Sequence, residues 1–147
     1  MATVFAKLNL KDHKQIVVLD SPGSFESELA ALQGVEVLRD LKKVKQVTFS
    51  LAFVTTPQQI DALAPKLARK AEGDAILWFA YPKGTSKKYN SQIDRDHGWT
   101  TLGQEGFEPV RMVAIDEDWS AKRFRRATFI KNMTRPKNHR LTDRAKP

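Results

Sequence analysis

The 147-residue chain contains no cysteine. Disulfide bonds and thiolate zinc sites are therefore excluded, and nothing indicates an oxidising compartment. No run approaches the roughly 18 apolar residues that a membrane-spanning helix needs. Lys7 and Lys11 come too early for the apolar segment of a signal peptide. We therefore expect a cytoplasmic protein without a membrane anchor.

Glycine-rich phosphate loops are also lacking. The segment DSPGS (20–24) has one glycine, where the dinucleotide fingerprint G-x-G-x-x-G needs three. The segment KGTSKK (83–88) does not have the spacing of G-x-x-x-x-G-K-[ST]. Neither segment indicates a cofactor, so we expect none.

The net charge of +8 is concentrated at one end of the chain. Residues 1–119 carry 15 Lys and Arg against 16 Asp and Glu, whereas residues 120–147 carry 10 against the single Asp143. The last part, 129–147, shows little apolar periodicity. We expect a single domain over residues 1–128 and a basic tail over 129–147, which either binds nucleic acid through phosphates or is merely solvated.

Apolar runs of strand length alternate with helical patterns. Strands are expected at 16–20, 47–54, 75–81, 109–115 and 120–128, with a further one at 35–40. A first helix is expected to begin at Ser24 and end at Gly34.

A second helix has a stronger start signal. Thr56, Pro57 and Gln59 form a capping-box pattern, and Gly73 is the expected end. Pro65 predicts a kink or a break inside this helix. A short helix near Trp99 follows.

Strand alternating with helix predicts an α/β fold, a three-layer Rossmann-like sandwich with a mainly parallel sheet and an antiparallel C-terminal strand. Ligands of such sheets bind beyond the carboxyl ends of the strands, where the loops converge. Hydroxyls, helix N-termini and lysines there favour an anionic small molecule or nucleotide. The candidate ligand-binding residues are Asp20, Ser21, Ser24, Thr55, Thr56, Tyr81, Lys83 and Lys87, with Arg95, Asp96 and Trp119 further along the chain. Caps and solvated lysines explain several of them equally well.

The cluster Asp94-Arg95-Asp96-His97 has the atoms for a metal site or an acid/base pair. Ligands so close in sequence seldom converge on one ion, and Asp94 also fits as a helix cap. We therefore predict no metal and assign no catalytic residue.

Three segments together resemble a small uncharacterised bacterial domain-of-unknown-function family, over roughly residues 15–126. The pattern is Y-P-K at 81–83, R-D-x-G-W at 95–99 and D-x-x-W-S-A-x-R-F-R at 116–125. The resemblance implies no activity. The order of elements also resembles the second half of class I methyltransferases, which bind S-adenosylmethionine with a glycine-rich first loop and an acid ending the second strand. The segment DSPGS departs from that loop.

Three functions follow from these patterns. The first is a small binding or regulatory protein that takes an anionic ligand or a partner at the carboxyl edge of the sheet, around Lys83. The second is a reduced methyltransferase-like enzyme with Asp96 or His97 as acid or base. The third is a nucleic-acid-associated protein acting through its tail. The oligomeric state is left open.

Overall fold

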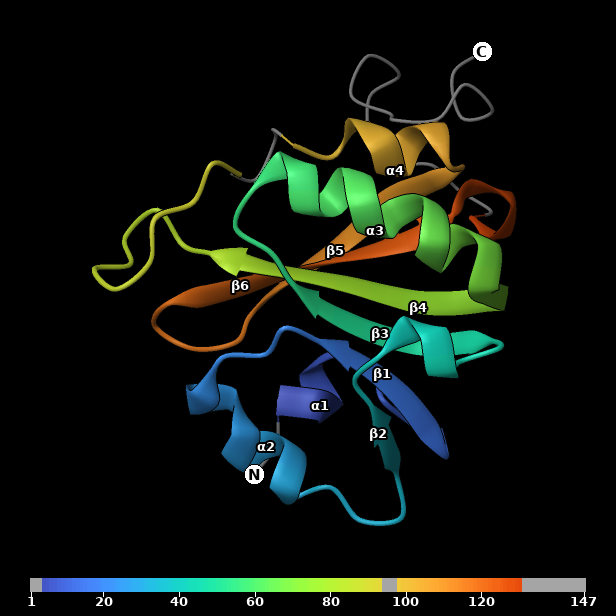
Figure 1. Ribbon diagram of the computed structural model, residues 1–147, viewed down its shortest axis with the longest axis horizontal. Coiled ribbons are helices and arrows are strands. Elements are labelled where there is room, and N and C mark those ends of the chain that lie inside the picture. The colour runs from blue at the N-terminus through green and yellow to red at the C-terminus, as the bar shows by residue number, and fades with distance from the viewer. Residues whose placement is uncertain (1–3, 94–97, 131–147) are drawn as a thin grey trace.

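A six-stranded sheet forms the centre of the molecule (Figure 1). The computed structural model describes residues 4–93 and 98–130. The strand order is β2-β1-β3-β4-β6-β5. The strands are β1 (Gln15–Leu19), β2 (Glu36–Leu38), β3 (Val47–Phe53), β4 (Ala71–Pro82), β5 (Phe107–Ala114) and β6 (Trp119–Arg126).

The sheet is mainly parallel, as the sequence predicts. Strand β1 pairs in parallel with β2 and β3, and β3 pairs in parallel with β4. Strand β6 is antiparallel to both of its neighbours, β4 and β5. A register shift interrupts the β5–β6 pairing between Pro109 and Arg111. The expected α/β fold with an antiparallel end is therefore confirmed.

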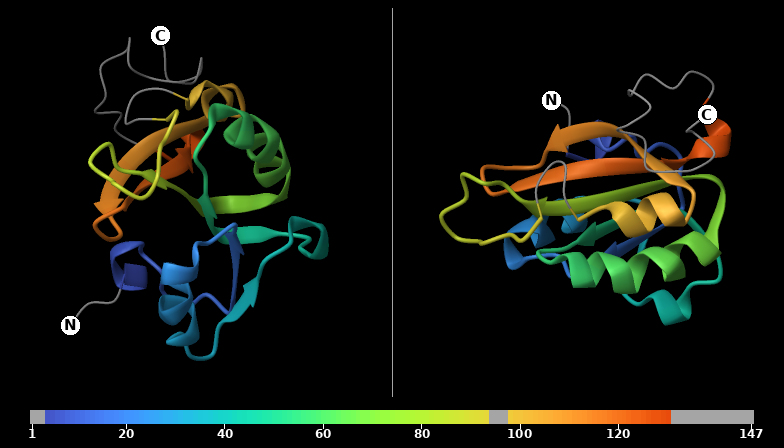
Figure 2. Two further views of the ribbon diagram at one scale, coloured as in Figure 1. Left: turned by 60° about the vertical axis from the view of Figure 1, so that its left-hand side comes forward. Right: turned by 90° about the horizontal axis from the view of Figure 1, so that it is seen from above.

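Helices cover both faces of the sheet (Figure 2). Helices α1 (Val4–Lys7) and α2 (Glu26–Ala30) contribute to one apolar cluster, and α3 (Pro57–Lys70) and α4 (Thr100–Gln104) contribute to the other. Side chains alternate between the clusters along each strand, so Ile16 and Val18 face α1 whereas Val17 and Leu19 face α3. Three 3₁₀ turns complete the fold: η1 (Gly23–Phe25), η2 (Leu41–Lys43) and η3 (Ala127–Phe129).

Local signals predict the start of α3 correctly. The Thr56 hydroxyl accepts a hydrogen bond from the Gln59 amide at 3.3 Å, and the Gln59 side chain accepts one from the Thr56 amide at 3.2 Å. Pro57 occupies the first turn. The helix runs on through Pro65, so the expected break is absent. The buried Ile60, Ala64 and Leu67 offset the amide that Pro65 lacks.

Two other predicted helix boundaries are wrong. Ser24 does not cap a helix, because it lies inside η1 and the residue before α2 is Phe25. The left-handed Gly73 (φ 57°) does not end α3 either, since the chain is already extended at Ala71 and Gly73 lies within β4. The chain forms η1 at the first place, and at the second the β3–β4 pairing is irregular between Ala71 and Ile76.

The connection from β2 to β3 is unusually short. It contains only η2, and its Leu41 and Val44 pack in the α3 cluster. The Lys70 ammonium at the end of α3 donates to the carbonyls of Leu41 and Val44, at 2.7 and 2.6 Å. A three-turn crossover helix is therefore absent here, and the α3 face near β1 and β2 is only partly covered.

Strand β4 is buried on both faces. Its residues from Ala75 to Pro82 are all buried, and Trp78 is fully buried against the segment that follows α1. The Trp78 Nε1–H donates to the Leu8 carbonyl at 2.7 Å. Within the described ranges, no helix is long and apolar enough to cross a membrane. Residues 131–147 lie outside the described residues, so the domain boundary at 128 stays a prediction.

Trp78→Ala should lower the free energy of unfolding by about 3 to 5 kcal/mol, because it leaves a large cavity in the core. Trp78→Phe keeps most of the apolar volume but leaves the Leu8 carbonyl without its donor. Its cost should be smaller, about 1 to 3 kcal/mol. Urea unfolding of both variants measures the two contributions; an alanine variant as stable as wild type would contradict this role.

Candidate functional site

The carboxyl ends of β1, β3 and β4 meet at one edge of the sheet, where the sequence places its candidate residues. Asp20 directly follows β1, is exposed and has a left-handed backbone (φ 57°). Lys83 directly follows β4. Two hollows lie at this edge, and they have different chemistry.

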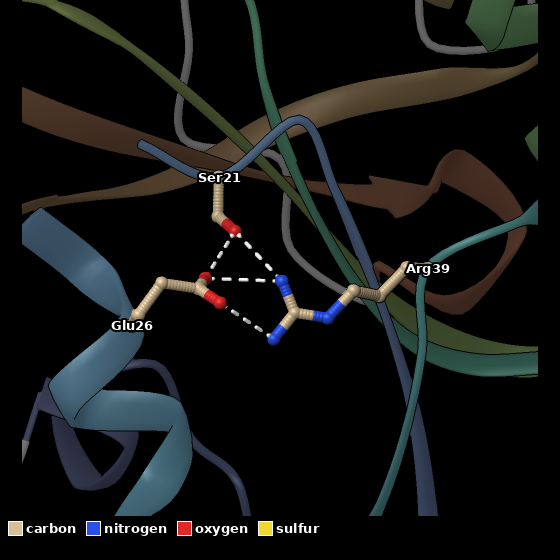
Figure 3. A network of polar contacts seen from close by, with 3 residues as sticks. All are labelled: Ser21, Glu26 and Arg39. Atoms are coloured by element: carbon tan, nitrogen blue, oxygen red, sulfur yellow. Dashed lines mark hydrogen bonds and ion pairs between the residues drawn. The ribbon is translucent and has the colours of Figure 1, made fainter. Parts of the chain in front are cut away.

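A polar cluster closes the β1–α2 loop onto the end of β2 (Figure 3). The Arg39 guanidinium donates to both carboxylate oxygens of Glu26, each at 3.0 Å. The Ser21 hydroxyl donates to the same carboxylate at 2.9 Å and accepts from Arg39 at 3.4 Å. These hydrogen bonds, first from Arg39 and then from Ser21, lower the pKa of Glu26. Ser21 therefore already has a structural role in joining the two strand ends.

The first hollow, here called the β1–β2 pocket, has a volume of about 360 Å³. Apolar side chains from β1, η2 and α3 line its inner part, and charged side chains line the rest. The charges are five basic and two acidic groups. The lining residues are Leu19, Asp20, Arg39, Asp40, Leu41, Lys42, Leu63, Lys66, Arg69 and Lys70. The pocket lies where the short β2–β3 connection leaves the α3 face incompletely covered.

Asp40 is the acid of this pocket that the sequence analysis misses. It lies two residues beyond the end of β2, and one of its carboxylate oxygens caps η2 by accepting from the Lys42 amide at 3.0 Å. The signal for it is present in the sequence, because an acid about 20 residues beyond the first strand's loop is the position that contacts ribose in dinucleotide-binding folds. The expected strand at 35–40 ends at this residue.

The second hollow, here called the β4-loop pocket, has a volume of about 570 Å³. It is formed mainly by the loop after β4. Its lining residues are Tyr81, Pro82, Lys83, Gly84, Thr85, Ser86, Tyr89, Asn90, Ser91, Ile93 and Ser120. One ammonium group and several hydroxyls thus surround a space large enough for a small ligand.

The loop of this pocket is held to two other segments. The Ser86 hydroxyl donates to the Asp118 carboxylate at 2.8 Å, and the Lys83 amide donates to the Asp118 carbonyl at 2.8 Å. The Gln92 amide donates to the Thr55 carbonyl at 2.9 Å. The pocket is therefore bounded by a loop with defined attachments.

The remaining candidate residues are distributed outside the two pockets. Thr55 and Thr56 bond Gln59 at the start of α3. Trp119 is buried, with its ring 5.1 Å from that of Phe53 and 5.0 Å from that of Tyr89. This packing makes Trp119 an anchor of the β5–β6 hairpin.

Ser24 and Lys87 are exposed and line neither pocket. Arg95 and Asp96, with the rest of the 94–97 cluster, lie outside the described residues. Among the residues that are described, no group of three His, Asp or Glu side chains is placed to hold a metal ion. Ligand binding by every candidate residue stays a prediction.

Comparison with known proteins identifies a fold. No family model and no curated protein matches the chain. Among solved structures, it is similar to an S-adenosylmethionine-dependent methyltransferase from Aquifex aeolicus, with 13% identity and a TM-score of 0.59 over 84% of this chain and 88% of that one. It is also similar to magnesium protoporphyrin IX methyltransferase from Synechocystis PCC 6803 with bound S-adenosylmethionine, with 12% identity and a TM-score of 0.51 over 84% of this chain and 74% of that one. At these identities the likeness establishes a Rossmann-like, methyltransferase-type fold alone, and the distant fold resemblance expected from the sequence is confirmed.

Arg39→Gln should raise the pKa of Glu26 toward its ordinary value of 4.5, because it removes the main hydrogen bond to the carboxylate. A carboxyl group whose pKa is lowered by folding stabilises the fold above its unfolded pKa, and this contribution disappears as the pH falls through the lowered value. The stability difference between wild type and variant should therefore be present at neutral pH and shrink below pH 4.5. An NMR titration of the Glu26 carboxyl carbon measures the shift; equal pKa values in the two proteins would show that the ion pair does not persist in solution.

Proposed function

We propose that this protein is a methyltransferase-like enzyme that binds an adenosine-containing cofactor, of the S-adenosylmethionine class, in the β1–β2 pocket. The observation that carries the proposal is the position of Asp40, a carboxylate at the carboxyl end of β2 beside an apolar pocket. Acids at this place in Rossmann-type folds accept hydrogen bonds from ribose hydroxyls. The methyltransferase-type fold supports the same assignment.

The pocket has groups for each part of a nucleoside. Leu19, Leu41 and Leu63 offer apolar surface for the base. Asp40 uses one carboxylate oxygen to cap η2, which leaves the other for the ribose hydroxyls. The volume of about 360 Å³ lies within the range of small-molecule sites, roughly 300 to 1,000 Å³. A nucleoside is therefore accommodated in both size and polarity.

The charge of the pocket affects the binding of the amino-acid part of the cofactor most. Five basic side chains against two acidic ones attract a carboxylate and oppose a sulfonium cation. The β1 loop adds little to binding this part, since it has a single glycine, Gly23. When bound, S-adenosylmethionine supplies a methyl group carried on its sulfonium. Its demethylated product, S-adenosylhomocysteine, has a neutral sulfur and suits this pocket better.

Asp40→Asn should weaken S-adenosylhomocysteine binding roughly tenfold, because a charged acceptor for the ribose hydroxyls becomes a neutral amide. Asparagine is as good a cap as aspartate, so η2 is preserved. Isothermal titration calorimetry measures the affinity, and Asp12→Asn, a substitution of an exposed acid before β1, is the control.

Two further comparisons test the same site. Wild type should bind S-adenosylhomocysteine more tightly than S-adenosylmethionine, and the difference should shrink as salt screens the basic side chains. Absence of binding by wild type, or equal affinities in wild type and Asp40→Asn, would overturn the proposal.

A second candidate function is an anion-binding or regulatory role for the β4-loop pocket. It is favoured by the Lys83 ammonium, which lines the pocket together with Thr85, Ser86 and Ser91. Hydroxyls and an ammonium group are common partners of phosphate and carboxylate ligands. In this role the protein binds a small anion and carries out no chemistry.

Lys83→Ala should reduce the rise in melting temperature that pyrophosphate causes, because only ligand bound to the native state stabilises it. Lys87→Ala is the matched comparison, since Lys87 is in the same loop but does not line the pocket. The sequence predicts that both substitutions reduce the rise in melting temperature. The structure predicts a larger reduction for Lys83→Ala, because Lys83 lines the pocket and Lys87 does not. Equal responses in Lys83→Ala and wild type would exclude this pocket.

A further inference from the structure

Three arginines lie on one face of the antiparallel β5–β6 pair. Arg111 is directly opposite Arg123 in the register, and Arg125 follows two residues later on the same face. Arg123 in turn is opposite Trp78 of β4, whose side chain belongs to the α1 cluster. The arginines therefore face the α1 side of the sheet.

Strands β6 and β5 are the last two in the strand order, and within the described residues β5 pairs with β6 alone. On this face the cluster of α1 and α2 extends to Trp119 and Ala121 of β6, and the segment after α1 reaches Trp78 of β4. The described helices therefore cover this end of the sheet only in part. Arg111 is exposed, and Arg123 is partly exposed. A ligand from solution can therefore reach the Arg111 side chain and the exposed part of Arg123, whose Nε is buried.

The three guanidinium groups differ in how they are neutralised. Arg125 forms a two-pronged ion pair with Asp74, at 2.8 and 2.6 Å. Among the described residues, no acid forms an ion pair or hydrogen bond with Arg111 or Arg123. The Arg123 Nε–H is buried without an acceptor. Burial, with the neighbouring charges of Arg125 and Arg111, also lowers the pKa of Arg123. The charge of Asp74 acts in the opposite direction on the pKa of Arg123 and so compensates it in part, but Asp74 forms its ion pair with Arg125.

This arrangement is unfavourable in the protein alone. Like charges directly opposite each other destabilise a strand pair, and a buried donor without an acceptor costs further stability. A bound oxyanion offsets the repulsion between the two charges, since guanidinium groups bind the oxygens of phosphate in a two-pronged geometry. The ligand class that fits two adjacent guanidinium groups on an open strand face is a phosphate group.

We propose that Arg111 and Arg123 form a phosphate-binding site on the open face of β5 and β6. This site is separate from both pockets at the carboxyl edge and does not depend on the proposed function. The phosphate belongs either to a small phosphorylated molecule or to a nucleic-acid backbone. Arg125 is neutralised by Asp74, so the positive charge of the site comes from Arg111 and Arg123.

Reversal of one charge gives the sharpest test. Arg111→Glu places a carboxylate opposite Arg123, so without added anion the variant should melt at or above the temperature of wild type. Pyrophosphate should raise the melting temperature of wild type, and the part of this rise that does not depend on Lys83 should be lost in Arg111→Glu. Lys45→Glu, an equal charge change on an exposed residue before β3, should keep the response. Arg111→Gln removes the charge without adding an acid and should weaken pyrophosphate binding at least tenfold.

The two sources of phosphate are separated by a second ligand, a 12-nucleotide thymidine oligomer, at low and at physiological salt. A response to pyrophosphate indicates a small-molecule site, and a response to the oligomer alone indicates a nucleic-acid backbone. All variants retain the basic tail, so only binding that Arg111→Glu abolishes and Lys45→Glu preserves supports the site. Absence of any response in wild type, or equal responses in wild type and Arg111→Glu, overturns the proposal.

Discussion

Burial of β4 on both faces is the constraint on which the rest of the fold depends. Trp78 and Ala80 pack toward α1, while Leu77, Phe79 and Tyr81 pack toward α3. The same strand pairs with β3 on one side and with β6 on the other, so it joins the parallel and antiparallel parts of the sheet. The Trp78 hydrogen bond to Leu8 also attaches the N-terminal segment to this strand. Both pockets and the arginine face are therefore positioned relative to a rigid central element.

The β1–β2 pocket exists because the connection from β2 to β3 has no full crossover helix. A full crossover helix would cover Leu19 and Leu63, whereas η2 leaves them lining an open space. The Lys70 hydrogen bonds to the Leu41 and Val44 carbonyls hold this connection against α3 without filling the pocket. A shortened connection thus provides a ligand-sized space at the position where Rossmann-type folds bind theirs.

The sequence predicts local structure correctly where residues close together in the chain determine it. The start of α3 is an example, because Thr56, Pro57 and Gln59 satisfy one another within a single turn. It fails where distant segments decide the outcome. The Ser24 hydroxyl is of the type that caps a helix. However, the chain forms a 3₁₀ turn that begins at Gly23, so Ser24 lies inside that turn. Pro65 is tolerated because the buried face of α3 holds the helix on both sides of it.

The candidate site shows the same limit. Asp20, Tyr81 and Lys83 are correctly expected near the carboxyl edge, since strand ends can be read from apolar runs. Their division between two pockets cannot be read in this way, because it depends on the path of the short β2–β3 connection and of the loop after β4. Asp40 differs from these residues, because its distance along the chain from the β1 loop already marks it as a position that contacts ribose. Arg111 and Arg123 lie opposite each other because β6 lies between β4 and β5 and because the β5–β6 register shifts after Pro109.

That register shift also bears on how the molecule avoids assembling with itself. Strand β5 is an edge strand, and an unprotected edge offers free amides and carbonyls to another copy of the chain. Proline has no amide hydrogen, and the irregularity between Pro109 and Arg111 disturbs the regular spacing that a partner strand would need. At the other edge, β2 is only three residues long. Each end of the sheet is thus a poor template for fibre growth, so the exposed Val110 and Met112 can be tolerated on β5.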